Sequence, residues 1–172
     1  MTDPHATNLL GSGALAVVDR MRAAVAEAAG LDGSGPAALV ALHLYAEGEG
    51  VDALARALSL SHSGAVRLVD QLVARGLVRR APSERDRRAV ALRLTAAGRR
   101  AARRVADARL AALGEALAPL SQADQERLAV LLGRVLAAQT HGHEDARRLC
   151  RLCDADACGH PERCPVTLAA HG

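Results

Sequence analysis

Residues 51–80 read VDALARALSLSHSGAVRLVDQLVARGLVRR, and this stretch decides the fold. Asp52 can cap a short helix that ends near Ser59. Almost immediately, Ser61 can cap a longer helix, which runs through about Ala74. Two helices joined by so short a turn must cross steeply, so the stretch predicts a helix-turn-helix.

The segment that follows changes from a helical to a β period. Leu77 begins a short β-prone run, and AVALRLT (89–95) alternates, with Val and Leu on one side and Ala91 and Arg93 on the other. The loop between these runs, PSERDRR (82–88), supplies the basic residues Arg85, Arg87 and Arg88. We expect a β-hairpin with a basic tip, and the order of elements predicts a winged helix-turn-helix.

Positive charge is concentrated on the same unit. The whole chain has a net charge of only +3, but residues 51–104 hold 13 Arg against four acidic residues. The remainder holds nine Arg against 15 acidic residues, so it is net negative. A concentrated basic segment indicates a polyanionic partner. In a winged helix-turn-helix, the second helix fits a DNA major groove and a basic hairpin can reach the neighbouring minor groove.

Helices are predicted on both sides of this unit. Helical spacing favours one helix over 13–29, closed by Gly30, and another from Pro36 to Gly48. After the hairpin, one helix extends to Pro119 and a last one starts at Ser121. The last helix has an aliphatic face, made of Leu128, Leu131, Leu132, Val135 and Leu136. Because apolar helices flank a compact unit, we expect a homodimer that buries them.

The sequence resembles the MarR family of bacterial transcriptional regulators. The matching segments are residues 51–80, the DRR at 86–88 and the LTAAG at 94–98. The likeness covers roughly residues 10–140 and implies duplex DNA as partner. It divides the chain into a MarR-like domain (1–140), with dimerisation helices (10–46 and 99–140) around a winged helix-turn-helix (51–98), and a cysteine-rich tail (141–172).

The resemblance also implies roles for single residues. Arg88 would enter the minor groove and Asp86 would orient it, together with Arg85 and Arg87 in the wing. The exposed face of the recognition helix would carry Ser61, His62, Ser63 and Arg67. Simpler roles remain open, because Ser61 can act as a helix cap, His62 can be an exposed helix residue and Arg67 can contact phosphates only. Gly64 departs from the side chain expected early in that helix.

All four cysteines lie in the tail, in the pattern C-x2-C-x4-C-x5-C: Cys150, Cys153, Cys158 and Cys164. Four thiolates can close on one tetrahedral zinc ion, so we expect one structural Zn²⁺ per chain. An iron–sulfur cluster is the first alternative, although ferredoxin spacing is tighter. Thiols that form reversible disulfides are the second. The tail follows the last dimerisation helix, so a change of metal or redox state there could shift the recognition helices.

Several other classes are disfavoured. The N-terminus lacks the features of a secretory signal, and no stretch reaches the roughly 18 apolar residues of a membrane span, so a cytoplasmic protein is expected. We find no glycine-rich phosphate loop, GxSxG or HExxH, which argues against an enzyme. RNA recognition is disfavoured because Tyr45 is the only Phe, Trp or Tyr. A small-molecule effector between the dimer helices and the DNA-binding unit remains open.

Overall fold

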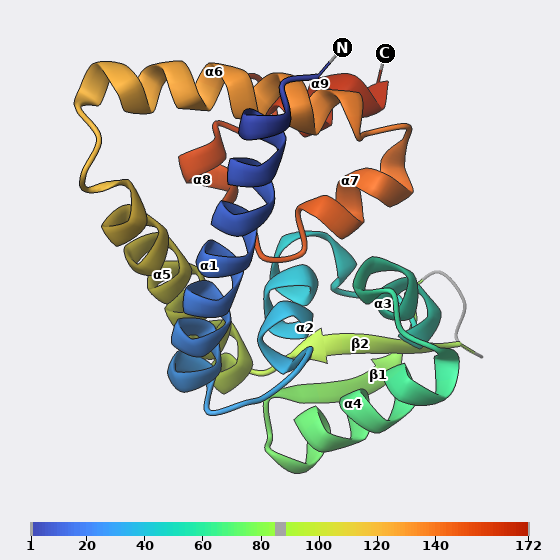
Figure 1. Ribbon diagram of the computed structural model, residues 1–172. Coiled ribbons are helices and arrows are strands. Elements are labelled where there is room, and N and C mark those ends of the chain that lie inside the picture. The colour runs from blue at the N-terminus through green and yellow to red at the C-terminus, as the bar shows by residue number, and fades with distance from the viewer. Residues whose placement is uncertain (1, 85–88, 172) are drawn as a thin grey trace.

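The computed structural model describes residues 2–84 and 89–171 and is mainly helical (Figure 1). Two strands form an antiparallel hairpin, so the predicted fold class is confirmed. The elements are α1 (Pro4–Ala29), α2 (Gly35–Ala41), a π-helical turn (Leu42–Ala46), α3 (Val51–Leu58), α4 (His62–Ala74), β1 (Val78–Pro82), β2 (Val90–Leu94), α5 (Ala96–Leu117), α6 (Gln122–Ala138), α7 (His143–Leu149), α8 (Ala155–Cys158) and α9 (Pro165–His171).

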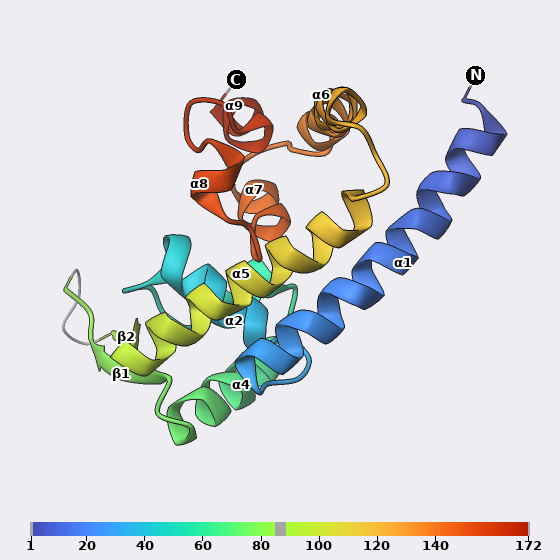
Figure 2. The same cartoon turned by 90° about the vertical axis from the view of Figure 1, so that its left-hand side faces the viewer.

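The long helices α1 and α5 lie side by side (Figure 2). The predicted start of the first helix at residue 13 is wrong, because α1 begins at Pro4 after the cap Asp3, whose carboxylate accepts from the His5 backbone N–H. Glycines within α1 do not stop it, since each weakens a helix by only about 1 kcal/mol. Its predicted end is confirmed, with Gly30 in the left-handed conformation at φ 62°.

A helix-turn-helix formed by α3 and α4 lies next to the hairpin and packs on α2, and we call residues 35–98 the winged unit. Ser61 caps α4 as predicted, by accepting a hydrogen bond from the Gly64 backbone N–H. Asp52 does not cap α3, because Gly50 occupies the cap position and Asp52 lies in the first turn. An acidic residue is favourable there as well, since it faces the positive end of the helix dipole.

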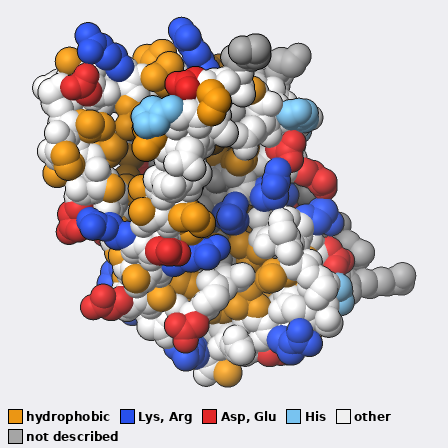
Figure 3. All heavy atoms as spheres, in the orientation of Figure 1, with side chains coloured by type: hydrophobic (Ala, Val, Ile, Leu, Met, Phe, Trp, Pro, Cys, Tyr) orange, Lys and Arg blue, Asp and Glu red, His pale blue; other side chains and the backbone are white. Residues whose placement is uncertain are grey.

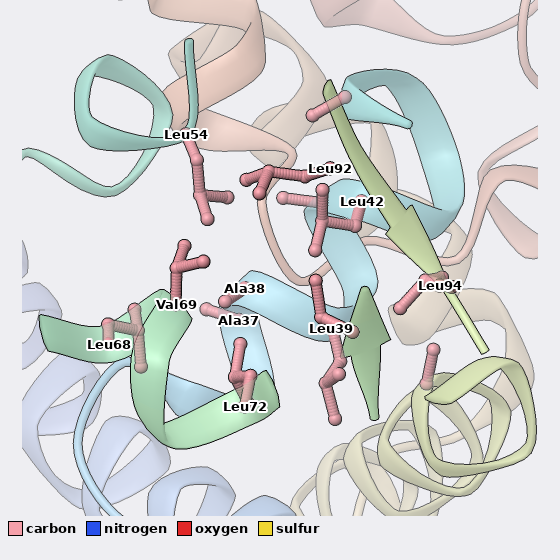
Figure 4. Packing of buried hydrophobic residues seen from close by; sticks show 14 of the residues in the cluster. Ala37, Ala38, Leu39, Leu42, Leu54, Leu68, Val69, Leu72, Leu92 and Leu94 are labelled. Atoms are coloured by element: carbon pink, nitrogen blue, oxygen red, sulfur yellow. The ribbon is translucent and has the colours of Figure 1, made fainter. Parts of the chain in front are cut away.

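The core of the winged unit is entirely aliphatic. Figure 4 shows side chains from α2, α3, α4 and β2 converging on one another. Leu54, Leu72 and Leu92 are each 0% exposed, and α2 is buried along its whole length. Burying a leucine side chain contributes about 1.5–3 kcal/mol, so this cluster accounts for much of the stability of the unit. The labelled residues are Ala37, Ala38, Leu39, Leu42, Leu54, Leu68, Val69, Leu72, Leu92 and Leu94.

The hairpin pairs Val78 with Leu94 and Pro82 with Val90. Its other edge is also engaged, because the backbone N–H of Gly48 donates to Leu92 O and that of Leu92 donates to Glu49 O, both at 2.8 Å. The predicted alternation of side chains along β2 holds, but it does not decide which residues are buried. Ala91, which it placed on the side away from the valine and leucines, is 1% exposed, while Val90 is 52% exposed. Since Ala91 and Leu92 point to opposite faces of β2 and are both buried, the base of the hairpin is covered on both faces.

The tail folds back between α6 and the winged unit (Figures 1 and 2). Its helix α9 packs on α6, and α7 packs on both α9 and α3. Within the described ranges 2–84 and 89–171, none of the helices combines the length and apolarity needed to cross a membrane. The tail is therefore a part of the folded chain that reaches the winged unit directly.

Candidate nucleic-acid interface and cysteine cluster

The outer face of α4 carries the polar residues that were predicted for it. Ser61, His62, Ser63 and Arg67 are all exposed, whereas Ala65, Leu68, Val69 and Leu72 point into the core. The core therefore fixes the orientation of the helix and leaves its N-terminal polar side chains in solvent. A role for these four residues in contacting DNA stays a prediction.

Hydrogen bonds already organise the start of α4. Ser61 Oγ accepts from the Gly64 backbone N–H at 3.1 Å and lies 3.3 Å from Ser63 Oγ. His62 Nδ1 lies 2.6 Å from Asp52 Oδ1 of α3, a pair that sequence reasoning missed because it assigned Asp52 to a cap. A Cβ on the unexpected Gly64 would lie 3.1 Å from Ser61 Oγ.

The predicted contacts of the wing tip fall on residues 85–88. Arg85, Asp86, Arg87 and Arg88 lie outside the described residues, so their predicted roles stay predictions. The flanking chain is in hairpin geometry, with the Ser83 backbone N–H donating to Ala89 O at 2.9 Å. The two strands thus lead directly into and out of the arginine-containing loop.

The LTAAG segment ties the base of the wing to α5. Thr95 Oγ1 donates to Gly76 O at 2.7 Å and accepts from the Gly98 backbone N–H at 3.0 Å. A Cβ at Gly98 would lie only 2.0 Å from Leu77 O, so no larger residue fits without moving the backbone. This motif is therefore structural, since it fixes the hairpin against a long helix.

Several arginines of the basic segment have acidic partners. Such pairs on the surface stabilise the fold only weakly, by about 0–1 kcal/mol. They do offset part of the positive charge that was counted from the sequence. The pairs are Arg80 with Asp70 at 2.8 Å, Arg99 with Glu47 at 3.4 Å, and Arg93 with Glu84.

The four cysteines gather in the tail although they come from different turns. Cys164 is 2% exposed, and Cys150, Cys153 and Cys158 are half-buried. All four line one cavity, and we call this set of side chains the thiol ring. Within it each thiol affects the pKa of its neighbours, Cys150 that of Cys153, and Cys158 and Cys164 that of each other. The spacing in the sequence predicted this grouping.

The surroundings divide the thiols into two kinds. A hydrogen bond from Cys153 holds the pKa of Cys150 below its usual value and raises that of Cys153. Burial, with further contacts to the other thiols, raises the pKa of Cys158 to about 12. Burial opposes ionisation of Cys164, but hydrogen bonds from Thr167 and other donors outweigh it and lower that pKa. Two thiols are therefore stabilised as thiolates by their neighbours.

A cavity of about 470 Å³ separates the thiol ring from the winged unit. Its lining includes the four cysteines, His143, His160 and His171 from the tail, and Tyr45, Ala53 and Arg56 from the α2–α3 region. Across residues 2–84 and 89–171, no three Cys, His, Asp or Glu side chains stand in a geometry that could hold a metal ion. The thiols are thus neighbours that have not converged on a common point.

Polar contacts connect the tail to the winged unit beside this cavity. Arg147 of α7 forms two 3.0 Å contacts with the carboxylate of Glu49, and Tyr45 Oη donates to Arg147 O at 2.6 Å. Arg56 of α3 lies 3.3 Å from Glu144 of α7. Sequence analysis missed these contacts, since residues so far apart in the chain give no local signal of pairing.

Comparisons with known proteins agree with this geometry. A sequence model described as the MarR family matches residues 29–89. A probable transcriptional regulator from Pseudomonas aeruginosa is 30% identical, with a TM-score of 0.56 over 73% of this chain and 96% of that one. CouR from Rhodococcus jostii RHA1, solved with p-coumaroyl-CoA bound, is 27% identical, with a TM-score of 0.59 over 77% of this chain and 92% of that one.

Escherichia coli MarR in its apo form is 23% identical, with a TM-score of 0.61 over 74% of this chain and 96% of that one. No protein with a curated description matches the sequence significantly. Each of the three structures leaves about a quarter of this chain unmatched.

A capped helix with an exposed polar face, crossed by a second helix and followed by an antiparallel hairpin, defines the winged-helix class of DNA-binding proteins. Within that class, this chain belongs to the MarR family of transcriptional regulators.

Proposed function

We propose that the chain is a homodimeric regulator, acting as a repressor, that recognises specific sites in double-stranded DNA. The observation that carries the proposal is the outer face of α4, where Ser61, Ser63 and Arg67 are exposed while the opposite face is fixed in the core. Short polar side chains and an arginine at the start of a helix are suited to base edges and phosphates in a major groove.

The hairpin supports the same proposal. It leads into a loop whose sequence contains three arginines, and such a loop suits the negative potential of a minor groove. Its neighbours Arg80 and Arg93 have acidic partners, which offset part of their charge. The arginines in the loop sequence are the proposed contacts with DNA. By family resemblance Arg88 enters the groove and Asp86 orients it.

The apolar surface of the terminal helices supports a dimer. Leu9, Leu10 and Leu15 of α1 are 57–68% exposed, and α6 has no buried residue. Figure 3 shows hydrophobic side chains at the surface of the upper part of the molecule, where Figure 1 places α6. A second copy that covered these faces would place two α4 helices on one side of a duplex, where successive major grooves lie about 34 Å apart.

Regulation by an effector completes the proposal. DNA affinity responds to the state of the tail or to a small ligand in the space that the tail and the winged unit enclose. The cavity of about 470 Å³ between them is large enough for a small organic molecule, and CouR of the same fold was solved with an acyl-CoA ligand. The protein acts in the cytoplasm and catalyses no reaction.

Selection from a pool of random duplexes, followed by fluorescence anisotropy, tests the proposal. We expect an enriched site with two related half-sites about one helical turn apart, and affinity that falls steeply as salt rises. The matched single strand should bind far more weakly. A pool that yields no enriched duplex, or equal binding of the single strand, would contradict the proposal.

A further inference from the structure

The tail lacks the usual means of staying folded. Its helices α7, α8 and α9 have seven, four and seven residues, and helices this short are unstable alone. Among residues 141–171, only Cys164 and Val166 are buried. Segments with so little core normally need a covalent or metal cross-link. The thiol ring is placed where such a cross-link would join all three helices.

The chemistry of the ring fits one metal ion. All four cysteines line the same cavity, and four cysteine thiolates are a usual ligand set for a closed tetrahedral zinc site. The C-x2-C spacing of Cys150 and Cys153 is typical of zinc sites, whereas bacterial ferredoxins space their remaining cysteines more tightly than this chain does.

The backbone around the thiols supports a closed site. The Cys153 backbone N–H donates to Cys150 O at 2.9 Å, which brings the first pair together in a tight turn. Gly159 adopts φ 70° directly after Cys158 and so reverses the chain toward Cys164. The Leu168 backbone N–H donates to Cys164 O at 3.0 Å, so the first turn of α9 holds the backbone of this cysteine.

We propose that Cys150, Cys153, Cys158 and Cys164 bind one zinc ion as four thiolates, and that this closed tail docks on the winged unit through the Arg147–Glu49 pair. Loading requires the thiols to lose their protons and to turn inward from the ring, because they have not converged in the described residues. The ion would then join α7 to α8 and α9 at the edge of the cavity.

Docking connects the metal to the hairpin by a short path. Cys150 directly follows α7, and Arg147 of α7 donates two hydrogen bonds to the Glu49 carboxylate. The backbone carbonyl of Glu49 accepts from Leu92 in β2. Zinc therefore orders α7, and Arg147 of α7 in turn fixes Glu49, which is hydrogen-bonded to the edge of β2. An effect of zinc on DNA binding rests on the proposed function, whereas zinc binding and docking do not.

Metal analysis of the full chain, purified without air from medium containing zinc and iron, tests the site. We expect one zinc per chain and a colourless protein. Cobalt titration of the zinc-free chain should give the visible bands of a tetrahedral thiolate site, saturating at one equivalent. Cys158→Ser should abolish these bands, while His160→Ala should keep them, because His160 Nδ1 is engaged with Thr167 Oγ1 at 2.8 Å. Iron with inorganic sulfide, or cysteines recovered as disulfides, would overturn the site.

Two arginine variants test the docking without DNA. Arg147→Ala and Arg148→Ala each remove one positive charge from α7, but Arg148 pairs only within the helix, with Asp145 at 3.1 Å. If docking and zinc binding support each other, Arg147→Ala should lower the affinity for zinc, measured in competition with a chelator, by about fivefold or more. This factor is the lower end of the range typical of coupling between two sites. Equal zinc affinity in both variants would overturn the docking. If zinc binding behaves as expected but the chain does not bind duplex DNA, only the proposed function is contradicted.

Discussion

The winged unit and the cysteine tail are held in place by different forces. The winged unit buries leucines from α3, α4 and β2 around α2, and its hairpin is held by backbone hydrogen bonds. The tail buries little, and it is joined to the winged unit by ion pairs, one tyrosine hydrogen bond and the packing of Leu152 against the core. The contrast suggests that the winged unit is stable by itself, whereas the tail depends on its thiols and on conditions that change them.

The largest expected effect is a loss of stability of the winged unit. Gly98→Ala places a Cβ 2.0 Å from Leu77 O, so the backbone must move and the free energy of unfolding should fall by about 3 kcal/mol. Gly114→Ala on the same helix meets nothing within 4 Å and should stabilise by up to about 1 kcal/mol. Urea denaturation of both variants measures this difference. Equal stability would show that the contact at Gly98 is unimportant.

The next effect separates the two regions by function. Arg88→Ala should weaken binding to the selected duplex by roughly 1–3 kcal/mol, because family resemblance places this arginine in the minor groove. Arg134→Ala removes an exposed arginine of α6, outside the winged unit, and should leave affinity nearly unchanged. Anisotropy titrations at one salt concentration compare them. Equal losses of affinity would mean that DNA binding depends only on the total positive charge of the chain.

A smaller effect sharpens the role of the start of α4. Ser61→Ala removes the cap of the Gly64 N–H and should lower the free energy of unfolding by about 1 kcal/mol. Ser63→Ala has no such cap to lose and should change stability by less than about 0.5 kcal/mol. If thermal denaturation shows the same loss of stability for both variants, the Ser61 cap does not stabilise α4 as expected.

The smallest effect concerns the metal-free tail. The pKa of Cys150 is lowered and that of Cys153 is raised by the hydrogen bond between them, so Cys150 becomes a thiolate at lower pH. The thiolate is the form that reacts with iodoacetamide, so Cys150 should be alkylated before Cys153 as pH rises from neutral. Peptide mass spectrometry gives the order. Earlier modification of Cys153 would contradict the arrangement of the ring.

Local signals in the sequence predicted the winged unit well. Ser61 as a cap, Gly30 as a helix end and the exposed face of α4 follow from rules that act within a few residues. Local signals do not give what distant chain segments decide. Ala91 and Leu92 are both buried although they lie on opposite faces of β2, and strand alternation alone could not predict this.

The candidate site divides in the same way. The grouping of the four cysteines could be predicted from their spacing, because all lie within one short segment. The Arg147–Glu49 and His62–Asp52 pairs could not, since they join separate elements and depend on how those elements pack. Sequence therefore suggested a metal site in the tail but not its contact with the wing.

Hydrogen exchange of the full chain, compared with and without zinc, tests most directly whether the two regions are ordered by different means. The account predicts that chelation speeds exchange in residues 141–171 and at Glu49, while Leu72 in α4 and Val105 in α5 keep their protection. Exchange that is unchanged throughout, or that rises equally in the tail and in these core helices, would contradict it.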